Sequence, residues 1–84
     1  MAQATLHVIV TSPERVLFDG MAAQVRVPGE QGTLEILPFH RPFMSRLLRG
    51  IVSVDATTFA IRRGIVHVVH DMVTAVVELP EQAA

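Results

Sequence analysis

The stretch that decides the fold runs Pro28-Gly29-Glu30-Gln31-Gly32-Thr33-Leu34-Glu35-Ile36-Leu37-Pro38-Phe39-His40-Arg41-Pro42-Phe43. Pro28-Gly29 and Gly32 bracket a turn, because proline fixes φ and glycine reaches conformations that a Cβ forbids. Thr33 to Leu37 alternates polar and apolar residues, which predicts a short strand. Pro38 cannot donate to a sheet ladder, so the strand ends there or runs along an edge. The loop that follows is stiffened by two prolines and carries an aromatic ring and a cation, which suits docking better than catalysis.

Outward from this stretch, short apolar runs alternate with turn signals. Strands are expected over residues 6–10, 15–18, 21–27, 51–54, 59–62, 65–69 and 73–77, whereas 43–48 fits a strand or one helical turn. Asp19-Gly20 predicts a hairpin turn, and further turns are expected at Asp55-Ala56-Thr57 and His70-Asp71-Met72. Eight or nine strands with turn signals about every 8–12 residues predict an all-β sandwich or barrel. The last hairpin is apolar on both faces, so we expect it to be covered on both sides, by the other sheet and by a partner.

Composition excludes several classes of function. The chain has 84 residues, half of them hydrophobic, and a net charge of −1, which predicts one small domain without a basic field for nucleic acid or anionic lipid. It has no cysteine, so disulfide scaffolds and thiolate zinc sites are excluded. No apolar run reaches the roughly 18 residues of a transmembrane helix. Met1 to His7 lacks the plan of a signal or transit peptide. Residues 1–4 and 80–84 are expected to fray.

Residues that could carry chemistry do not assemble into a recognisable site. The Gly29-x-x-Gly32 spacing lacks the Lys-Ser/Thr pair and the helix of a phosphate loop. No Ser-His-Asp pattern is evident. The histidines have neither cysteines nor clustered carboxylates beside them to complete a metal site; they are His7, His40, His67 and His70. The aspartates at predicted turns are expected to bond nearby backbone amides; they are Asp19, Asp55 and Asp71. We therefore predict no catalytic, cofactor-binding or metal-binding residues, and a function based on contact.

One family carries the same motifs in the same order. Gly32 to Met44 resembles the Gly-x-Leu-Gly-Ile-Leu-Pro-Gly-His-Ala-Pro-Leu-Leu signature of the ε subunit of bacterial F-type ATP synthases. The flanking matches are Leu6–Pro13, Phe18-Asp19-Gly20, Val25–Gly29, Phe59–Val68 and Val73–Glu78. Together they cover the chain from Leu6 to about Leu79, and the ordered set is more specific than any single motif.

The chain also departs from the family pattern. Glu35 and Phe39 stand where the family has glycine, and Arg41 replaces its alanine. Arg63 replaces the first of two glycines, and His67 replaces a glutamate. These changes indicate a divergent branch, of the kind carried by alternate and sodium-linked ATPase operons.

The resemblance implies a fold and a role. The fold would be the family's N-terminal domain, a two-sheet antiparallel β-sandwich of about ten short strands. The family usually continues into a C-terminal helical hairpin. Because this sequence stops at Ala84, we expect either that the hairpin is absent or that the sequence is trimmed before it. The implied role is that of a non-catalytic rotor subunit in the central stalk. It would dock the γ subunit onto the c-ring and couple ion translocation to ATP synthesis or hydrolysis. It would be peripheral, at the cytoplasmic face of the bacterial inner membrane, and would meet the membrane only through the c-ring.

The resemblance also assigns site residues. By motif position, Ser12 and His40 fall where the family contacts γ, and the segment Glu30, Gln31, Gly32 and Thr33 falls where it contacts the polar loops of the c-ring. We add the hypothesis that Phe39 and Phe43 anchor the γ side with Arg41 as a charged rim. Core packing is an equal alternative for Phe43, and a solvated turn is an equal alternative for Glu30 and Thr33.

Two other classes of function compete with this interpretation. The first is a free-standing β-sandwich module that binds a peptide, another protein or a carbohydrate. The absence of Trp and Tyr counts against sugar binding, which uses exposed aromatic rings. The second is a small enzyme, which the missing constellation of catalytic groups disfavours.

Overall fold

The computed structural model describes residues 5–80, which form nine strands and no helix. The strands are β1 Leu6–Thr11, β2 Val16–Ala22, β3 Val25–Gly29, β4 Gly32–Ile36, β5 Phe43–Leu47, β6 Gly50–Val54, β7 Thr57–Ile61, β8 Arg63–Val69 and β9 Met72–Glu78. Within the segment 43–48, for which the sequence allows a strand or one helical turn, residues 43–47 form a strand. The expected fraying of 1–4 and 81–84 lies outside the described residues, whereas Pro80 is described and is half-buried.

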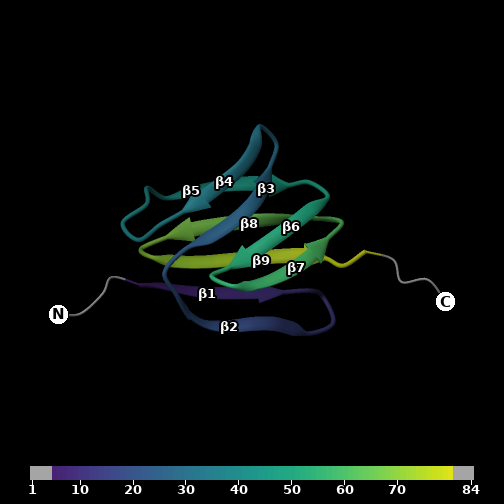
Figure 1. Cartoon of the computed structure of the whole chain (residues 1–84), viewed down its shortest axis with the longest axis horizontal. Helices are drawn as coiled ribbons and strands as arrows, with labels where there is room; N and C mark the ends of the chain where they lie inside the picture. Colours follow the sequence, from purple (N-terminus) through teal and green to yellow (C-terminus); the bar gives the residue numbers. More distant parts are fainter. Residues whose placement is uncertain (1–4, 81–84) are drawn as a thin grey trace.

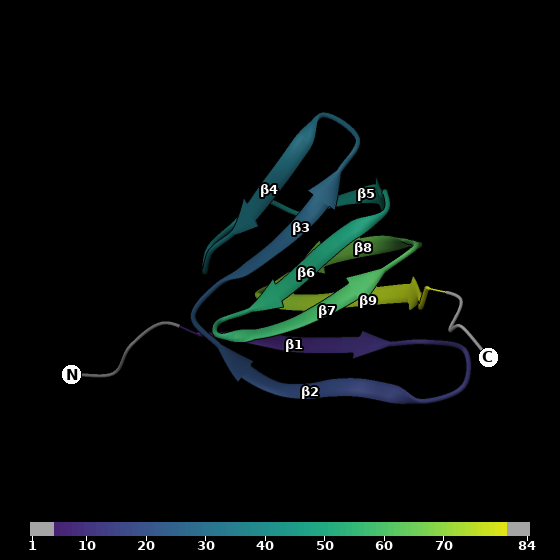
Figure 2. The same cartoon turned by 45° about the vertical axis from the view of Figure 1, so that its right-hand side comes forward.

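The strands form two layers (Figures 1 and 2). One has the order β2-β1-β9-β8-β5 and the other contains β4-β3-β6-β7, whose strands cross the first layer obliquely in Figure 2. A single pair, Gly29 with Leu47, joins β3 to β5, so the two layers are one curled sheet. Neighbouring strands are antiparallel apart from β1 and β9, which run parallel. The predicted all-β two-sheet sandwich is confirmed, with nine described strands for the expected ten or so and one parallel pair.

The core lies between the layers and is built mostly of valine. Residues on β1 and β9 alternate between buried and more exposed positions, as expected for strands with one face on a core. The β-branched valines fit such a pleated, half-buried surface. The buried apolar residues are Leu6, Val8, Val10, Ala22, Val25, Val27, Ile36, Leu47, Val52, Val54, Ile61, Val66, Val68, Val73, Ala75 and Val77.

The hairpin turn predicted at Asp19-Gly20 is wrong. Strand β2 runs straight through both residues, because Asp19 pairs with Ile9 and Gly20 with Val8 in the ladder to β1. The β1–β2 reversal has already been made by residues 12–15, so a second turn four residues later would leave half of this ladder unpaired. The chain instead reverses at Ala23 and Gln24, between β2 and β3.

The other predicted turns are confirmed. Glu30-Gln31 connects β3 to β4, which ends at Ile36, before Pro38. His70 and Asp71 connect β8 to β9 with φ values of 51° and 60°. Two positive φ values are the pattern of a type I′ turn, whose twist matches that of the flanking strands.

Candidate functional site

The β4–β5 loop, residues 37–42, passes from one layer to the other and is tied to the β8–β9 turn. The amide of Phe39 donates to Oδ1 of Asp71 at 2.7 Å, and the amide of His40 donates to the carbonyl of Leu37 at 3.2 Å. Phe39 has a φ of 67° and is 82% exposed. The loop therefore has a fixed backbone but presents its aromatic side chain to solvent.

His40 and Phe43 form a small aromatic cluster beside this loop. Their ring centroids are 4.9 Å apart with an interplanar angle of 47°. His40 Nδ1 lies 2.8 Å from the carbonyl oxygen of Arg41. Phe43 is half-buried and packs against the core. Core packing, the alternative kept for Phe43, is thus part of its role, and contact of His40, Arg41 and Phe43 with γ stays a prediction.

The β3–β4 tip, residues 30–33, is exposed throughout. Glu30 accepts a hydrogen bond from Arg46 Nη2 at 3.0 Å, and Gly32 has a φ of 118°, which favours glycine. Glu30 and Gln31 also line a hollow of about 300 Å³ together with His40 and Phe43. Two residues predicted for the c-ring, Glu30 and Gln31, are therefore neighbours of two predicted for γ, His40 and Phe43, around one hollow. Contact of the tip with the c-ring stays a prediction.

Ser12 lies apart from this group. It is only 5% exposed, and its hydroxyl accepts hydrogen bonds from the amides of Glu14 and Arg15 while donating to the carbonyl of Arg15. It follows the last residue of β1, whereas the β4–β5 loop sits near the start of β1, where the His7 amide bonds the Asp71 carbonyl. The structure does not bring Ser12 together with residues 39–43, and its contact with γ stays a prediction.

A larger surface is the outer face of the layer β2-β1-β9-β8-β5, turned away from the core. Strand register places Met44, His67, Thr74 and Ile9 in one row across four strands, with Arg46, Ile65 and Val76 in the next. The large apolar residues of this outer face include the exposed Met21, Met44, Ile65, Met72 and Val76 and the half-buried Ile9. The sequence predicts that the last hairpin is apolar on both faces, and Ile65 and Val76 are the residues of that hairpin for which the prediction places apolar side chains on this face. The methionines on β2 and β5 were missed, because their place beside this hairpin follows only from the strand order.

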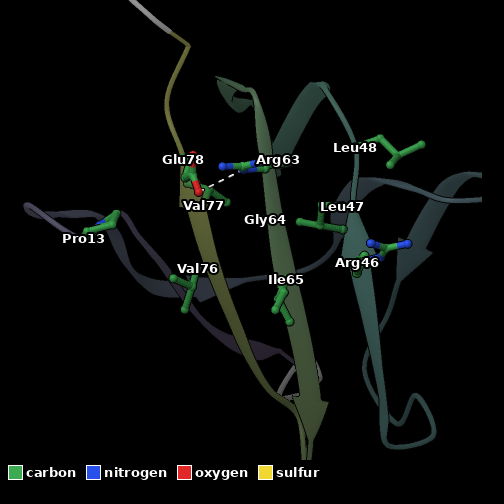
Figure 3. Close-up of a pocket in the computed structure, with 10 residues that line it drawn as sticks. All are labelled: Pro13, Arg46, Leu47, Leu48, Arg63, Gly64, Ile65, Val76, Val77 and Glu78. Atoms are coloured by element: carbon green, nitrogen blue, oxygen red, sulfur yellow. Dashed lines mark hydrogen bonds and ion pairs between the residues drawn. The ribbon is translucent and has the colours of Figure 1, made fainter.

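A hollow of about 470 Å³ lies at the end of the outer face near Pro13, with Ile65 and Val76 side by side along it (Figure 3). The ion pair between Arg63 Nε and Glu78 Oε2, at 3.0 Å, borders it. Gly64 is required there, because a Cβ at this position would lie 2.6 Å from the carbonyl oxygen of Val76. The hollow is mainly apolar, so it offers contact area rather than reactive groups.

The titratable groups are scattered over the surface. His67 stands on the outer face, His70 in the β8–β9 turn, and His7 pairs with Asp19 at 2.9 Å. Among residues 5–80, no three His, Cys, Asp or Glu side chains are placed to hold a metal ion. The same residues include no helix long and apolar enough to cross a membrane. What the described surface offers is an apolar sheet face and two exposed connections beside it.

The chain matches the family described as ATP synthase, Delta/Epsilon chain, beta-sandwich domain over residues 5–83. The chain belongs to this family. It is 51% identical over 51 residues to the ATP synthase epsilon chain of Bordetella avium, a match that covers 61% of this chain and 36% of that one. It is 38% identical over 86 residues to the epsilon chain of Bordetella petrii, covering 96% and 61%. The resemblance to the ε subunit seen in the sequence is confirmed, and the chain spans only part of the length of these relatives.

Solved structures share the fold at low sequence identity. The Euglena gracilis mitochondrial ATP synthase, determined with OSCP, F1 and c-ring, contains a chain that matches with a TM-score of 0.81 and 18% identity, covering 92% of this chain and 52% of that one. The central stalk and c-ring of the Tetrahymena thermophila mitochondrial ATP synthase gives a TM-score of 0.72 and 17% identity, with 93% and 66% covered. These matches confirm the β-sandwich fold.

Proposed function

We propose that this protein is a rotor subunit in the central stalk of an F-type ATP synthase, where it docks the γ subunit onto the c-ring. Its family membership and its epsilon-chain relatives support this proposal, and both matched structures are ATP synthase assemblies that include a c-ring. The observation that carries it is the outer face. An exposed apolar sheet face of this extent is expected where another protein packs.

Each surface has a partner in this proposal. The γ subunit covers the outer face and reaches the β4–β5 loop, and the β3–β4 tip meets the polar loops of the c-ring. The tip projects beyond the other strands at the top of Figure 1, which suits a contact with a separate body. Glu30, Gln31, His40 and Phe43 line one hollow, which supports the proposal that the two contacts are side by side. A close-packed sandwich resists deformation, so it can pass torque from one contact to the other.

The subunit is non-catalytic in this proposal, and the chemistry of ATP takes place in other subunits of the complex. Coupling to the ion gradient, whether of protons or sodium ions, passes through the stalk as rotation. The protein would be peripheral at the cytoplasmic face of the bacterial inner membrane, with the c-ring as its only link to the bilayer. The non-catalytic role, the coupling and the location all follow from the proposed role as a rotor subunit, and the experiment that tests that role tests them too.

Two matched isoleucines test the assignment of the outer face. Ile65 lies on β8 in the outer face and is 48% exposed, whereas Ile51 lies on β6 in the other layer and is 52% exposed. Both can be changed to glutamate without placing a charge in the core, because both side chains are exposed. We expect Ile65→Glu to weaken binding to the cognate γ subunit by roughly 30-fold or more, because a charge would be buried in an apolar contact. Ile51→Glu is expected to bind like the wild type.

The measurement is a titration of purified γ with each variant, after thermal melts have shown that both fold. Co-purification of the tagged chain with γ and the c-ring tests the role as a whole. A wild-type chain that captures neither partner contradicts the proposed function. Equal loss of γ binding in Ile65→Glu and Ile51→Glu contradicts the assignment to the outer face.

A further inference from the structure

Phe39 is the odd member of a small group of strained residues. Four residues other than glycine have positive φ among residues 5–80, and three of them are Asp55, His70 and Asp71. Aspartate and histidine are enriched in the left-handed region, because their short polar side chains bond locally. Phenylalanine has no such compensation. Its ring also packs on nothing that would offset the strain, since 82% of Phe39 is exposed.

Asp71 holds Phe39 in this conformation. The hydrogen bond from the Phe39 amide to Oδ1 of Asp71, at 2.7 Å, joins residues 32 positions apart. Asp71 is itself fixed by the tight β8–β9 turn and by the His7 amide, which donates to its carbonyl at 2.9 Å. The position of the Phe39 backbone is thus set by β1, β8 and β9, the central strands of the layer that carries the outer face.

The same connection makes Phe39 continuous with the outer face. Met72 follows Asp71 directly, and strand register pairs Met72 with Val69 on one side and with His7 on the other. This row is the end of the outer face nearest the β4–β5 loop. A partner that covers the row therefore lies next to the loop that carries the exposed Phe39.

We propose that Phe39 is the anchor residue for the γ subunit, entering an apolar socket on it, and that Asp71 is the positioning residue that holds Phe39 ready to bind. This inference rests on the proposed function and names a contact within it. Backbone strain of this kind is common at binding sites, where the strained conformation presents a group to a partner. An aromatic side chain that fills a pocket on its partner commonly contributes much of the binding energy of a contact. A glycine at this position would fold with less strain but would have no ring to insert.

Two substitutions at Phe39 separate the strain from the contact. Both Phe39→Gly and Phe39→Ala remove the ring, but only glycine relieves the left-handed backbone. We expect Phe39→Gly to raise the melting temperature of the chain by roughly 4–8 °C, with Phe39→Ala within about 2 °C of the wild type. Both variants should weaken binding to γ by roughly tenfold or more. The paired result, higher stability with lower affinity, is the signature of the proposal.

Two substitutions at Asp71 test the positioning role. Asp71→Gly keeps the positive φ that the turn requires but removes the carboxylate, whereas Asp71→Asn keeps an oxygen acceptor. We expect Asp71→Gly to speed hydrogen exchange at the Phe39 amide and to weaken γ binding by roughly three- to tenfold, with Asp71→Asn close to the wild type. A destabilised turn alone would not change exchange at Phe39 selectively.

The outcomes are distinct. Wild-type affinity in Phe39→Gly, with γ bound normally by the wild type, overturns the anchor role and leaves the proposed function standing. An unchanged melting temperature in Phe39→Gly shows that the backbone is not strained. Unchanged exchange and affinity in Asp71→Gly overturn the positioning role. If the wild-type chain does not bind γ, the proposed function falls and this inference falls with it.

Discussion

The two faces of the layer β2-β1-β9-β8-β5 carry the same kinds of residue but differ in what covers them. On β5, Leu47 faces the other layer and is 1% exposed, whereas Met44 faces outward and is 66% exposed. On β9, Val77 is buried and its neighbour Val76 is exposed. Only one face is covered by the second layer, so only that face contributes its apolar area to folding. Hydrophobic side chains on the outer face are surplus to the fold, which is why we assign them to a partner.

The largest expected effect tests this difference directly on β5. Leu47→Ala should lower the free energy of unfolding by about 2–5 kcal/mol, because it leaves a cavity in the core. Met44→Ala should change it by less than about 0.5 kcal/mol, because removing a largely exposed side chain leaves no cavity in the core. Denaturant unfolding of the two variants and the wild type measures both values.

The two substitutions remove side chains of similar size from one strand, so each is the control for the other. A loss in Met44→Ala as large as that in Leu47→Ala would mean that the outer face is already covered in the isolated chain, for example by a second copy. Repeating the unfolding at several protein concentrations identifies that case, since the stability of a dimer depends on concentration.

A smaller effect is expected at two glycines on the inner side of this layer. Gly64 pairs with Leu47 and Val77, and a Cβ there would lie 2.6 Å from the Val76 carbonyl oxygen, so Gly64→Ala should cost about 1–3 kcal/mol. Gly20 lies on the edge strand β2 without a positive φ, and a Cβ there would meet only the Phe18 ring at 3.6 Å. Gly20→Ala should therefore stabilise the chain by roughly 0.5–1 kcal/mol.

Thermal melts of the two alanine variants test whether the melting temperature falls for Gly64→Ala and rises for Gly20→Ala. The result at Gly20 also tests the structure against the local sequence signal. A hairpin turn at Asp19-Gly20 would place the glycine at positive φ, where alanine is strained, and the substitution would then destabilise the chain.

The sequence predicted well the features that depend on neighbouring residues. The turn before Gly32, the strand that ends before Pro38 and the turn at His70-Asp71 follow from local conformational preferences, and the structure has all of them. Asp19-Gly20 carries an equally strong local signal, but pairing with β1 outweighs it. Whether a local turn signal forms a turn depends on pairing with strands that are distant in the sequence. A short stretch of sequence does not show that pairing.

Features that join distant segments could not be predicted. The aspartates were expected to bond nearby amides, yet Asp55 accepts from the amides of Ala23 and Gln24, 31 or 32 residues away, and Asp71 accepts from Phe39. The burial of Ser12 and the neighbourhood of Glu30 with His40 likewise follow from tertiary packing. The replacement of a family glycine by Phe39 was visible in the sequence, whereas its left-handed backbone was not.

The smallest expected effect concerns the charge pair that joins the outer face to the β3–β4 tip. Arg46 Nη2 and Glu30 Oε2 are 3.0 Å apart, and both side chains are substantially exposed. Water and salt screen such a pair, and ordering two long side chains costs entropy. A double-mutant cycle with Arg46→Gln and Glu30→Gln should therefore give a coupling free energy of about 0.2–1 kcal/mol, falling as salt is raised. A larger, salt-insensitive coupling would show that the tip is held rigidly to β5 and that the outer face contributes to the fold after all. A small coupling leaves Glu30 free to exchange Arg46 for a partner group at little cost, as a residue in a docking contact must.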